Sequence, residues 1–206
     1  MITIINYGLG NLGSIKNMLK KVGAASVITD DLDTIRAASK LILPGVGAFD
    51  TGMQKLADCG LIDVLHHKAL EEKIPILGIC LGVQLMTRGS HEGQLPGLGW
   101  FAADTVAFDF QGIEGKYTVP NMGWNEVELN QPDSPLFEEM FPDPRFYFVH
   151  SFHLKPDDPA HTLTYSDYGY SYASALAHEN LLGVQFHPEK SHKFGQRLLR
   201  NFVKNY

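Results

Sequence analysis

This sequence contains little cysteine, no long apolar run and no excess of basic residues. The 206 residues include two cysteines, Cys59 and Cys80, too few for the disulfide framework of a small secreted domain. No apolar stretch is long enough to cross a bilayer. Residues 1–8 lack the basic and apolar regions of a signal peptide. We therefore expect a cytoplasmic protein with no membrane partner.

The charge balance excludes another class of partner. Lysine and arginine total 17 against 23 aspartates and glutamates, for a net charge of -6. Nucleic-acid binding relies on a basic surface that neutralises phosphates, so we expect no nucleic-acid partner. Hydrophobic residues make up 44% of the chain, an ordinary proportion for a globular protein. No linker or repeat divides the chain, and we expect one domain over residues 1–206.

Strands and helices alternate in the first half of the chain. Short apolar, β-branched runs predict strands, and apolar residues at helical spacing predict helices. We expect strands over residues 2–6, 26–29, 40–43 (ending at Pro44) and 74–79, and helices over 14–22, over 49–73 with a break at Gly60, and from about 82. This alternation is typical of an α/β protein whose open, mostly parallel sheet is flanked by helices.

The second half has a different pattern. Residues 90–99 predict a loop, and short alternating runs between 105 and 129 predict antiparallel strands. We also expect strands over 145–150, 168–177 and 181–185, a hairpin turn at 178–180 and a closing helix over 194–206. The antiparallel strands are therefore additions to the parallel sheet.

A glycine-rich turn follows the first predicted strand. Gly8, Gly10 and Gly13 fit the pattern GxGxxG, and Asp30 and Asp31 follow the next strand. This arrangement favours a dinucleotide site and thus a nicotinamide-dependent oxidoreductase. The alternative is a turn that needs glycine only for its backbone conformation and close packing.

Cys80 stands between two glycines where a strand gives way to a helix. The sequence Gly78-Ile79-Cys80-Leu81-Gly82 has the pattern of a nucleophile elbow, with cysteine in the place of serine. The N–H groups at the start of the helix favour a thiolate. A buried structural cysteine is the alternative. Cys59 lacks this setting, and we expect it to be structural.

A candidate base and its orienting carboxylate follow the strand at 181–185. His187 and Glu189 lie two residues apart, on one face of an extended segment, with Pro188 between them. A carboxylate in this position orients an imidazole that takes a proton from a thiol. As an isolated tripeptide the motif also fits a surface turn.

The loop after the strand at 40–43 is rich in glycine. In Pro44-Gly45-Val46-Gly47 the glycines leave backbone N–H groups free to point into a cleft, where they could stabilise an oxyanion. An ordinary loop is the alternative. This loop, Cys80 and His187 all follow predicted parallel strands, at the edge where open α/β sheets bind their ligands.

Histidine is the only residue type that suggests a metal. The chain has nine histidines, including His66-His67 and the pair His150 and His153. No second group of histidines or cysteines at ligand spacing accompanies them, and we expect no metal.

Taken together, Gly78–Gln84, Gly183–Glu189 and Pro44–Gly47 resemble the motifs of the triad (class I) glutamine amidotransferases. Within this family, Pro44–Phe49, Met122–Asn125 and Tyr147–Phe152 are similar to the glutaminase subunits of imidazole glycerol phosphate synthase, an enzyme of histidine biosynthesis. The resemblance covers essentially the whole chain. It implies a flavodoxin-like fold, the hydrolysis of glutamine to glutamate and ammonia, no cofactor, and a heterodimer with a synthase (cyclase) barrel subunit that takes the ammonia.

The resemblance also implies roles for individual residues, and it implies that the Gly8–Gly13 turn faces the partner rather than a dinucleotide. Three residues would form the catalytic triad: Cys80, His187 and Glu189. The backbone N–H groups that stabilise the oxyanion would belong to Val46, Gly47 and Leu81. Five residues would bind glutamine: Gly45, Gln84, Glu92, Ser151 and Phe152. The partner would contact Asn11, Trp124 and Tyr147.

Two features depart from the pattern of the subfamily. Asn121 stands where these subunits usually have histidine, and the opening Gly8–Ser14 is similar to a paralogous branch that supplies ammonia for the amidination of surface-polysaccharide sugars. We expect both segments to lie near the partner face. The glutaminase chemistry is unaffected, but the acceptor of the ammonia has two alternatives.

Overall fold

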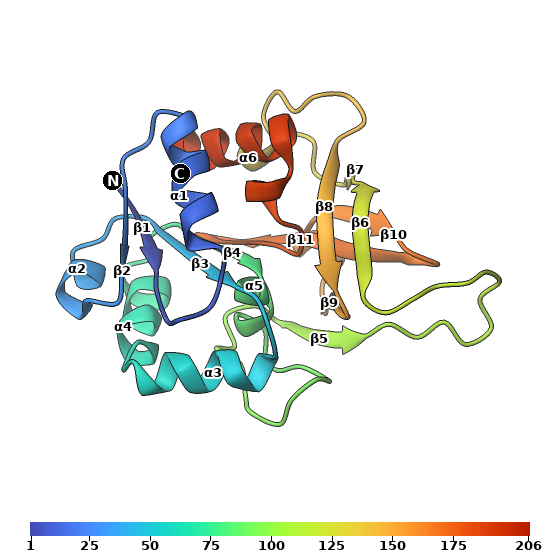
Figure 1. Ribbon diagram of the computed structural model, residues 1–206, viewed down its shortest axis with the longest axis horizontal. Coiled ribbons are helices and arrows are strands. Elements are labelled where there is room, and N and C mark those ends of the chain that lie inside the picture. The colour runs from blue at the N-terminus through green and yellow to red at the C-terminus, as the bar shows by residue number, and fades with distance from the viewer.

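A mixed ten-stranded sheet forms the centre of the computed structural model, which describes residues 1–206 (Figure 1). The strands follow the order β2-β1-β3-β4-β12-β11-β10-β7, with β9 paired to β11 and β5 paired to β9. The first five are parallel to one another, and the other pairings are antiparallel. A second sheet consists of the antiparallel pair β6 and β8. The α/β fold class with added antiparallel strands is confirmed.

The elements have the following bounds. The strands are β1 (Ile2–Ile5), β2 (Ser26–Thr29), β3 (Leu41–Gly45), β4 (Ile76–Cys80), β5 (Ala103–Ala107), β6 (Asn121–Glu126), β7 (Glu128–Leu129), β8 (Arg145–His150), β9 (Phe152–Pro156), β10 (Thr162–Asp167), β11 (Ser171–His178) and β12 (Leu181–Val184). The helices are α1 (Leu12–Lys21), α2 (Leu32–Arg36), α3 (Phe49–Asp58), α4 (Ile62–His66), α5 (Leu81–Leu85) and α6 (His192–Asn205). A π-helical turn at His67–Glu71 continues α4.

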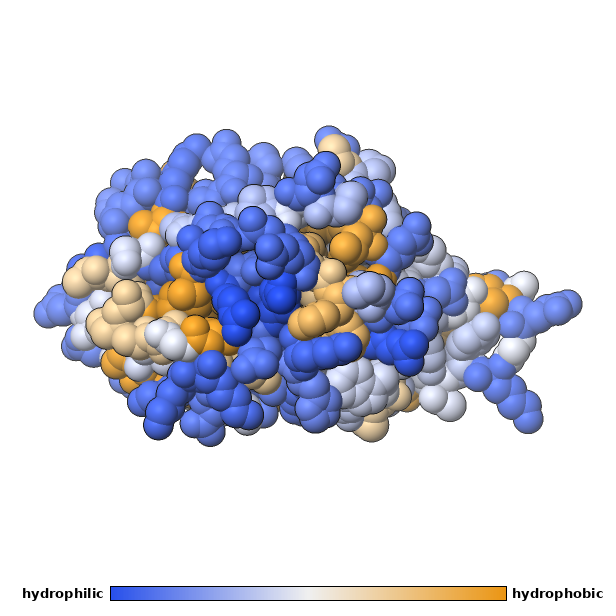
Figure 2. Space-filling model, turned by 90° about the horizontal axis from the view of Figure 1, so that it is seen from above, coloured by the Kyte–Doolittle hydropathy of each residue, from blue (hydrophilic) through white to orange (hydrophobic).

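Helices cover both faces of the parallel part of the sheet. Along β1, Ile4 packs with the apolar side chains of α1 and α6, whereas Ile5 packs with those of α3 and α4. Successive strand residues point to opposite faces, so the sheet separates two apolar clusters. Figure 1 shows α1 and α6 on one side and α2, α3 and α4 on the other. Figure 2 views the side of α1 and α6, which is mostly hydrophilic with a few apolar patches.

Most of the elements expected from the sequence are present. The predicted strands at 26–29 and 145–150 coincide with β2 and β8. The helix break at Gly60 is confirmed, with φ of 64° at that glycine. The turn after His178 joins β11 to β12 as an antiparallel hairpin. None of the helices combines the length and apolar character needed to span a membrane.

The expected end of the third strand at Pro44 is wrong. β3 continues to Gly45, and Pro44 and Gly45 lie opposite Ile79 and Cys80 of β4. On its other side β3 pairs with β1 only at Leu41 and Ile42, so no neighbour there requires an N–H donor from the proline. The strand therefore carries Gly45 directly to the side of Cys80.

Two strands and one short helix were not expected from the sequence: β9, β10 and α2. β10 buries Thr162, Thr164 and Ser166, and Thr164 and Ser166 share hydrogen bonds with the Ser174 hydroxyl of β11. β10 carries only two apolar residues, Leu163 and Tyr165, between these hydroxyls, a run too short to stand out as a strand by its apolar alternation. β9 likewise buries a histidine, His153, beside Leu154.

Candidate active site

Three adjacent parallel strands end at one edge of the sheet. Gly45 at the end of β3 lies opposite Cys80 at the end of β4. On the other side of β4, Val184 at the end of β12 lies opposite Ile79. His187 follows three residues later. The topology therefore brings together the loop, the cysteine and the histidine that the sequence singled out, at the carboxyl edge where α/β sheets hold their sites.

Cys80 occupies a sharp turn from β4 into α5. Its backbone angles, φ of 53° and ψ of -112°, are rarely adopted by residues other than glycine. The flanking glycines are required by space, because a Cβ at Gly82 would overlap the Leu43 carbonyl oxygen and a Cβ at Gly78 would lie 2.8 Å from the Val83 nitrogen. The strained turn presents the sulfur at the start of α5, as in a nucleophile elbow.

His187 is fixed by its ring and by its backbone. Its Nδ1 lies 2.8 Å from Oε1 of Glu189, and both side chains are almost completely buried. The N–H of His187 donates to the Tyr147 carbonyl at 2.8 Å. The Ser191 hydroxyl donates to the His187 carbonyl and accepts from the N–H of Tyr147. The imidazole is thus held in one orientation by a carboxylate, as a general base requires.

The free nitrogen of His187 shares a cavity with Cys80. Nε2 is buried and has no hydrogen-bond partner. Burial by itself lowers the pKa of His187, but the interactions with Cys80 and Glu189 outweigh it and raise the pKa. The thiol of Cys80 donates to the Val149 carbonyl, with an S···O distance of 3.9 Å. A positively charged imidazole beside the sulfur favours a thiolate.

The cavity beside Cys80 has a volume of about 270 Å³, a size suited to a small ligand such as an amino acid. It brings together most of the residues singled out in the sequence. Its lining consists of Val46, Gly47, Cys80, Leu81, Gln84, Glu92, Pro120, Val149, His150, Ser151, Phe152 and His187. Gly45 and Glu189 are not part of this lining. Glu189 is connected to the cavity by its hydrogen bond with His187.

Gln84 and Glu92 line the cavity while being held by other groups. The side-chain N–H₂ of Gln84 donates to the Phe152 carbonyl at 3.3 Å and to Oε1 of Gln185 at 3.1 Å. The Glu92 carboxylate accepts the N–H of Phe49 at 2.8 Å, at the start of α3. Both residues therefore present a preorganised acceptor oxygen to the cavity.

Gly45 and Gly47 play different structural parts. A Cβ at Gly45 would overlap the Tyr7 hydroxyl and lie 2.9 Å from Cβ of Leu81, whereas a Cβ at Gly47 would meet nothing within 4 Å. Gly47 has φ of 108°. The Tyr7 hydroxyl donates to the Pro44 carbonyl at 2.6 Å, and burial, with the nearby Cys80, raises the pKa of Tyr7. The loop is therefore fixed up to Gly45 and unconfined at Val46 and Gly47.

Trp124 and Tyr147 lie side by side on the two-stranded sheet. Trp124 is 44% exposed and stacks on the His192 ring at 5.4 Å. Its ring centre is 6.3 Å from that of Tyr147, and the Lys190 ammonium lies over Tyr147. Exposed aromatic rings held in this way are typical of protein interfaces. Asn11 precedes α1 without capping it through its side chain.

Two glycines of the Gly8–Gly13 turn are required by backbone conformation, with φ of 83° at Gly8 and 108° at Gly10. A Cβ at Gly10 would press on the Pro44 ring at 3.2 Å. Asp31 accepts from the N–H and the hydroxyl of Thr34 as the cap of α2. One of the two carboxylates that a dinucleotide ribose could use is thus engaged at a helix start.

Asn121 is buried at the start of β6, the strand that also carries the exposed Trp124. The Asn121 side chain is 1% exposed and donates toward Nε2 of His150 and to the Tyr172 hydroxyl, each at 3.2 Å. It therefore lies behind the cavity. Neither His150 nor Gln185 was assigned a role from the sequence, because their contacts come from strands distant along the chain. The one available signal was the presence of both residues within the recognised motifs.

The fold and the site define an α/β protein with a thiol on a strand-to-helix turn, next to an imidazole held by a carboxylate. Comparison with protein families gives the particular class. The sequence model of the family described as glutamine amidotransferase class-I matches residues 3–206. The chain belongs to this family of glutamine-hydrolysing enzymes.

Curated relatives match over nearly the full length. The chain is 49% identical over 204 residues to "Imidazole glycerol phosphate synthase subunit HisH 2" of Methanococcus maripaludis, with 99% of each chain covered. It is 47% identical to the protein of the same name from Pseudomonas aeruginosa, again with 99% of each covered. A subunit named HisH from Bdellovibrio bacteriovorus is 43% identical, with 98% of each covered.

Solved structures support the fold. A structure titled as a glutamine amidotransferase has a TM-score of 0.75 at 16% identity and covers 99% of this chain and 98% of its own. A glutamine amidotransferase from Thermotoga maritima has a TM-score of 0.67 at 19% identity, covering 98% of this chain and 96% of its own. The sheet with its added antiparallel strands is thus the fold of glutamine amidotransferases.

Proposed function

We propose that this chain is the glutaminase subunit of an imidazole glycerol phosphate synthase, and that it passes ammonia to a barrel-shaped cyclase subunit in histidine biosynthesis. The observation that carries the proposal is the cavity that Cys80 and His187 share at the carboxyl edge of the sheet. The names of full-length relatives at 43% to 49% identity support the pathway.

The chemistry follows from the positions of three side chains. His187, oriented by Glu189, takes the proton of the Cys80 thiol, and the thiolate attacks the side-chain amide carbon of glutamine. His187 returns the proton to the amide nitrogen, the C–N bond breaks, and ammonia leaves a thioester on Cys80. Water then hydrolyses the thioester to glutamate, again with His187 as the base.

Backbone groups stabilise the charge that develops on the amide oxygen. The N–H of Leu81, at the start of α5, is one proposed donor, and the N–H groups of Val46 and Gly47 supply the other. The acceptor oxygens of Gln84 and Glu92 suit the ammonium end of the substrate. The backbone of Gly45, Ser151 and Phe152 would bind the rest of the glutamine.

The partner subunit is proposed to dock on the face that carries Trp124, Tyr147 and Asn11. The relatives are named as subunits, and ammonia needs a closed path to its acceptor if water is not to protonate it. The side chains of Val46 and Trp124 are 39% and 44% exposed. We propose that they flank the path of the ammonia and that docking of the partner covers both.

We expect the isolated subunit to be a poor glutaminase that its barrel partner activates about a hundredfold or more. The segment at Val46 and Gly47 is unconfined, so its peptide can turn an oxyanion donor away, and docking would turn that donor inward. One such donor lowers the activation barrier by ~3 kcal/mol. The check is ammonia release from glutamine by the chain alone and with the barrel subunit. Equal rates would contradict the proposal.

Trp124→Ala is expected to weaken binding of the barrel subunit by about 30-fold, because a central interface tryptophan is worth ~2 kcal/mol or more. Isothermal titration with the purified barrel measures this directly. Leu70→Ala is the matched control, since Leu70 is 50% exposed and precedes β4, at the opposite edge of the sheet. If both variants bound like the unaltered chain, the interface would have to lie elsewhere.

Growth without added histidine tests the pathway. The gene, supplied with the gene of its barrel partner, should restore growth to a strain that lacks this subunit, and Cys80→Ala should not. The second candidate acceptor is a surface-polysaccharide sugar that receives an amidine group, favoured by the Gly8–Ser14 opening. Asn121, which stands where the subfamily usually has histidine, is the second sequence feature on that side. Failure of complementation with full glutaminase activity would favour the polysaccharide acceptor.

A further inference from the structure

The carbonyl of Phe152 is held from two sides behind the cavity. Nδ1 of His150 lies 2.8 Å from this oxygen, and the side-chain N–H₂ of Gln84 donates to it at 3.3 Å. The second hydrogen of Gln84 goes to Gln185, so the Gln84 amide can present only its oxygen to the cavity. The orientation of the Phe152 peptide and that of the Gln84 amide are therefore set together.

The contacts of His150 fix which ring nitrogen carries the hydrogen. A carbonyl oxygen only accepts, so Nδ1 must be the donor. Nε2 must then accept, and it faces the side-chain N–H₂ of Asn121 and the Tyr172 hydroxyl, each at 3.2 Å. Asn121 is itself oriented, because its oxygen accepts from the Asn125 amide at 3.1 Å. Burial lowers the pKa of His150 to about 4, which agrees with a neutral ring.

We propose that His150 is a positioning residue for the glutaminase reaction. Its neutral ring, with the hydrogen on Nδ1, holds the Phe152 carbonyl and thereby sets the Ser151–Phe152 backbone and the Gln84 amide that receive the amino-acid end of glutamine. This inference rests on the proposed function. His150 lies at the corner where β8 of the small sheet gives way to β9 of the large one, so its ring fixes the junction between the two sheets.

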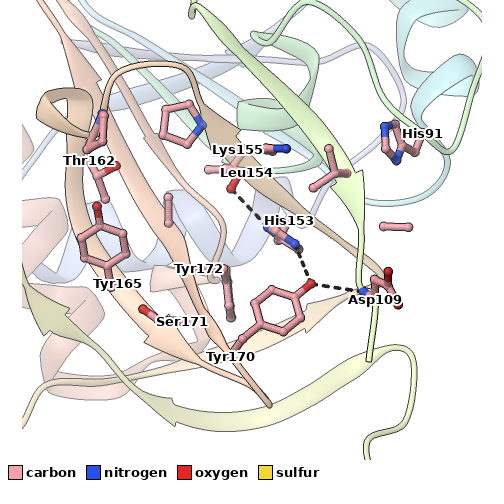
Figure 3. Close-up of a pocket in the computed structure, with 15 residues that line it drawn as sticks. His91, Asp109, His153, Leu154, Lys155, Thr162, Tyr165, Tyr170, Ser171 and Tyr172 are labelled. Atoms are coloured by element: carbon pink, nitrogen blue, oxygen red, sulfur yellow. Dashed lines mark hydrogen bonds between the residues drawn. The ribbon is translucent and has the colours of Figure 1, made fainter. Parts of the chain in front are cut away.

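A second histidine has the same chemistry and faces another cavity. Nδ1 of His153 lies 3.2 Å from the Leu154 carbonyl and its Nε2 lies 2.9 Å from the Tyr170 hydroxyl. Figure 3 shows this ring among the residues of a cavity of about 510 Å³, where the Tyr170 hydroxyl also accepts from the N–H of Asp109. His153 is buried and hydrogen-bonded like His150, but it has no hydrogen bond to Phe152 or Gln84. It is a matched control.

The test compares two substitutions that keep different nitrogens. The amide nitrogen of asparagine reaches the place of the histidine Nδ1, and that of glutamine reaches the place of Nε2. On the complex with the barrel subunit, we expect His150→Gln to raise the KM for glutamine about tenfold and to change kcat less. In His150→Asn, the KM should stay within about threefold of that of the unaltered chain. His153→Gln should leave the KM unchanged.

Several results would overturn the proposal. They are equal KM values for His150→Gln and His150→Asn, an unchanged KM in His150→Gln, or an equal rise in His153→Gln. An unaltered complex without glutaminase activity would remove the proposed function, and the inference with it. Nitrogen-15 NMR gives a readout apart from activity: at pH 7 the His150 ring should carry its hydrogen on Nδ1, and a hydrogen on Nε2 or on both nitrogens would refute the assignment.

Discussion

Cys80→Ala is expected to lower glutamine hydrolysis by about 10⁴-fold or more, because removal of the nucleophile removes the thioester route itself. The sulfur sits on a strained turn beside the unpartnered Nε2 of His187, and no other thiol lines the cavity. Glutamate formation by the complex with the barrel subunit is the measurement. Circular dichroism and binding to the barrel should be unchanged, since alanine fits the space of the thiol.

Cys59→Ala is the control for this substitution. Cys59 is the only other cysteine, and it is exposed at the end of α3. Its loss should leave turnover within about twofold of the unaltered chain, as is usual for surface positions. An electrophilic glutamine analogue should label Cys80 and not Cys59. Equal loss of activity in the two variants, with folding intact, would make the assignment of the nucleophile wrong.

His187→Asn is expected to lower kcat by about 10⁴-fold, and Glu189→Gln by about 10²-fold. Loss of the imidazole removes both the base and the charge that favours the thiolate. Loss of the carboxylate charge leaves the base in place but less well oriented. The oriented imidazole remains in Glu189→Gln, so this substitution should cost much less than Cys80→Ala. Single-turnover release of ammonia, which leaves as the thioester forms, measures the acylation step directly.

Two exposed residues of the hairpin between β11 and β12 provide the controls. His178→Asn and Glu179→Gln remove the same groups far from the cavity, where Glu179 pairs with Lys73 at the surface. Both should retain normal turnover. Because Glu189 is buried with His187, thermal unfolding should accompany the kinetics to separate lost chemistry from lost structure. Near-normal turnover in His187→Asn would require another base.

The arrangement explains why glycine recurs around the nucleophile. Gly78 and Gly82 flank Cys80, and Gly183 of β12 lies where a Cβ would overlap the Val83 side chain. The first turn of α5 is thereby pressed against the ends of three strands. This close packing places the Cys80 sulfur at the N-terminus of α5.

Local sequence determined the parts of this protein whose physical requirements are local. The strand at β2, the break at Gly60 and the hairpin after His178 depend on backbone conformations that neighbouring residues specify. The turn at Cys80 belongs with them, because two glycines and a strand-to-helix change were enough to predict it. His187 and Glu189 were predicted as a pair in an extended segment. The pair is present, but Pro188–Lys190 forms a 3-10 turn in place of the extended segment.

Tertiary structure decided what depends on contacts between distant segments. Pro44 remains in β3 because β3 pairs with β1 only at Leu41 and Ile42. The hydroxyls of β10 form hydrogen bonds with Ser174 of the neighbouring strand β11. The hydrogen-bond partners of Asn121 were not predicted, since only the fold places it between His150 and Tyr172. A polar side chain shows in sequence what it can donate and accept. Which partner it finds depends on the packing of the strands around it.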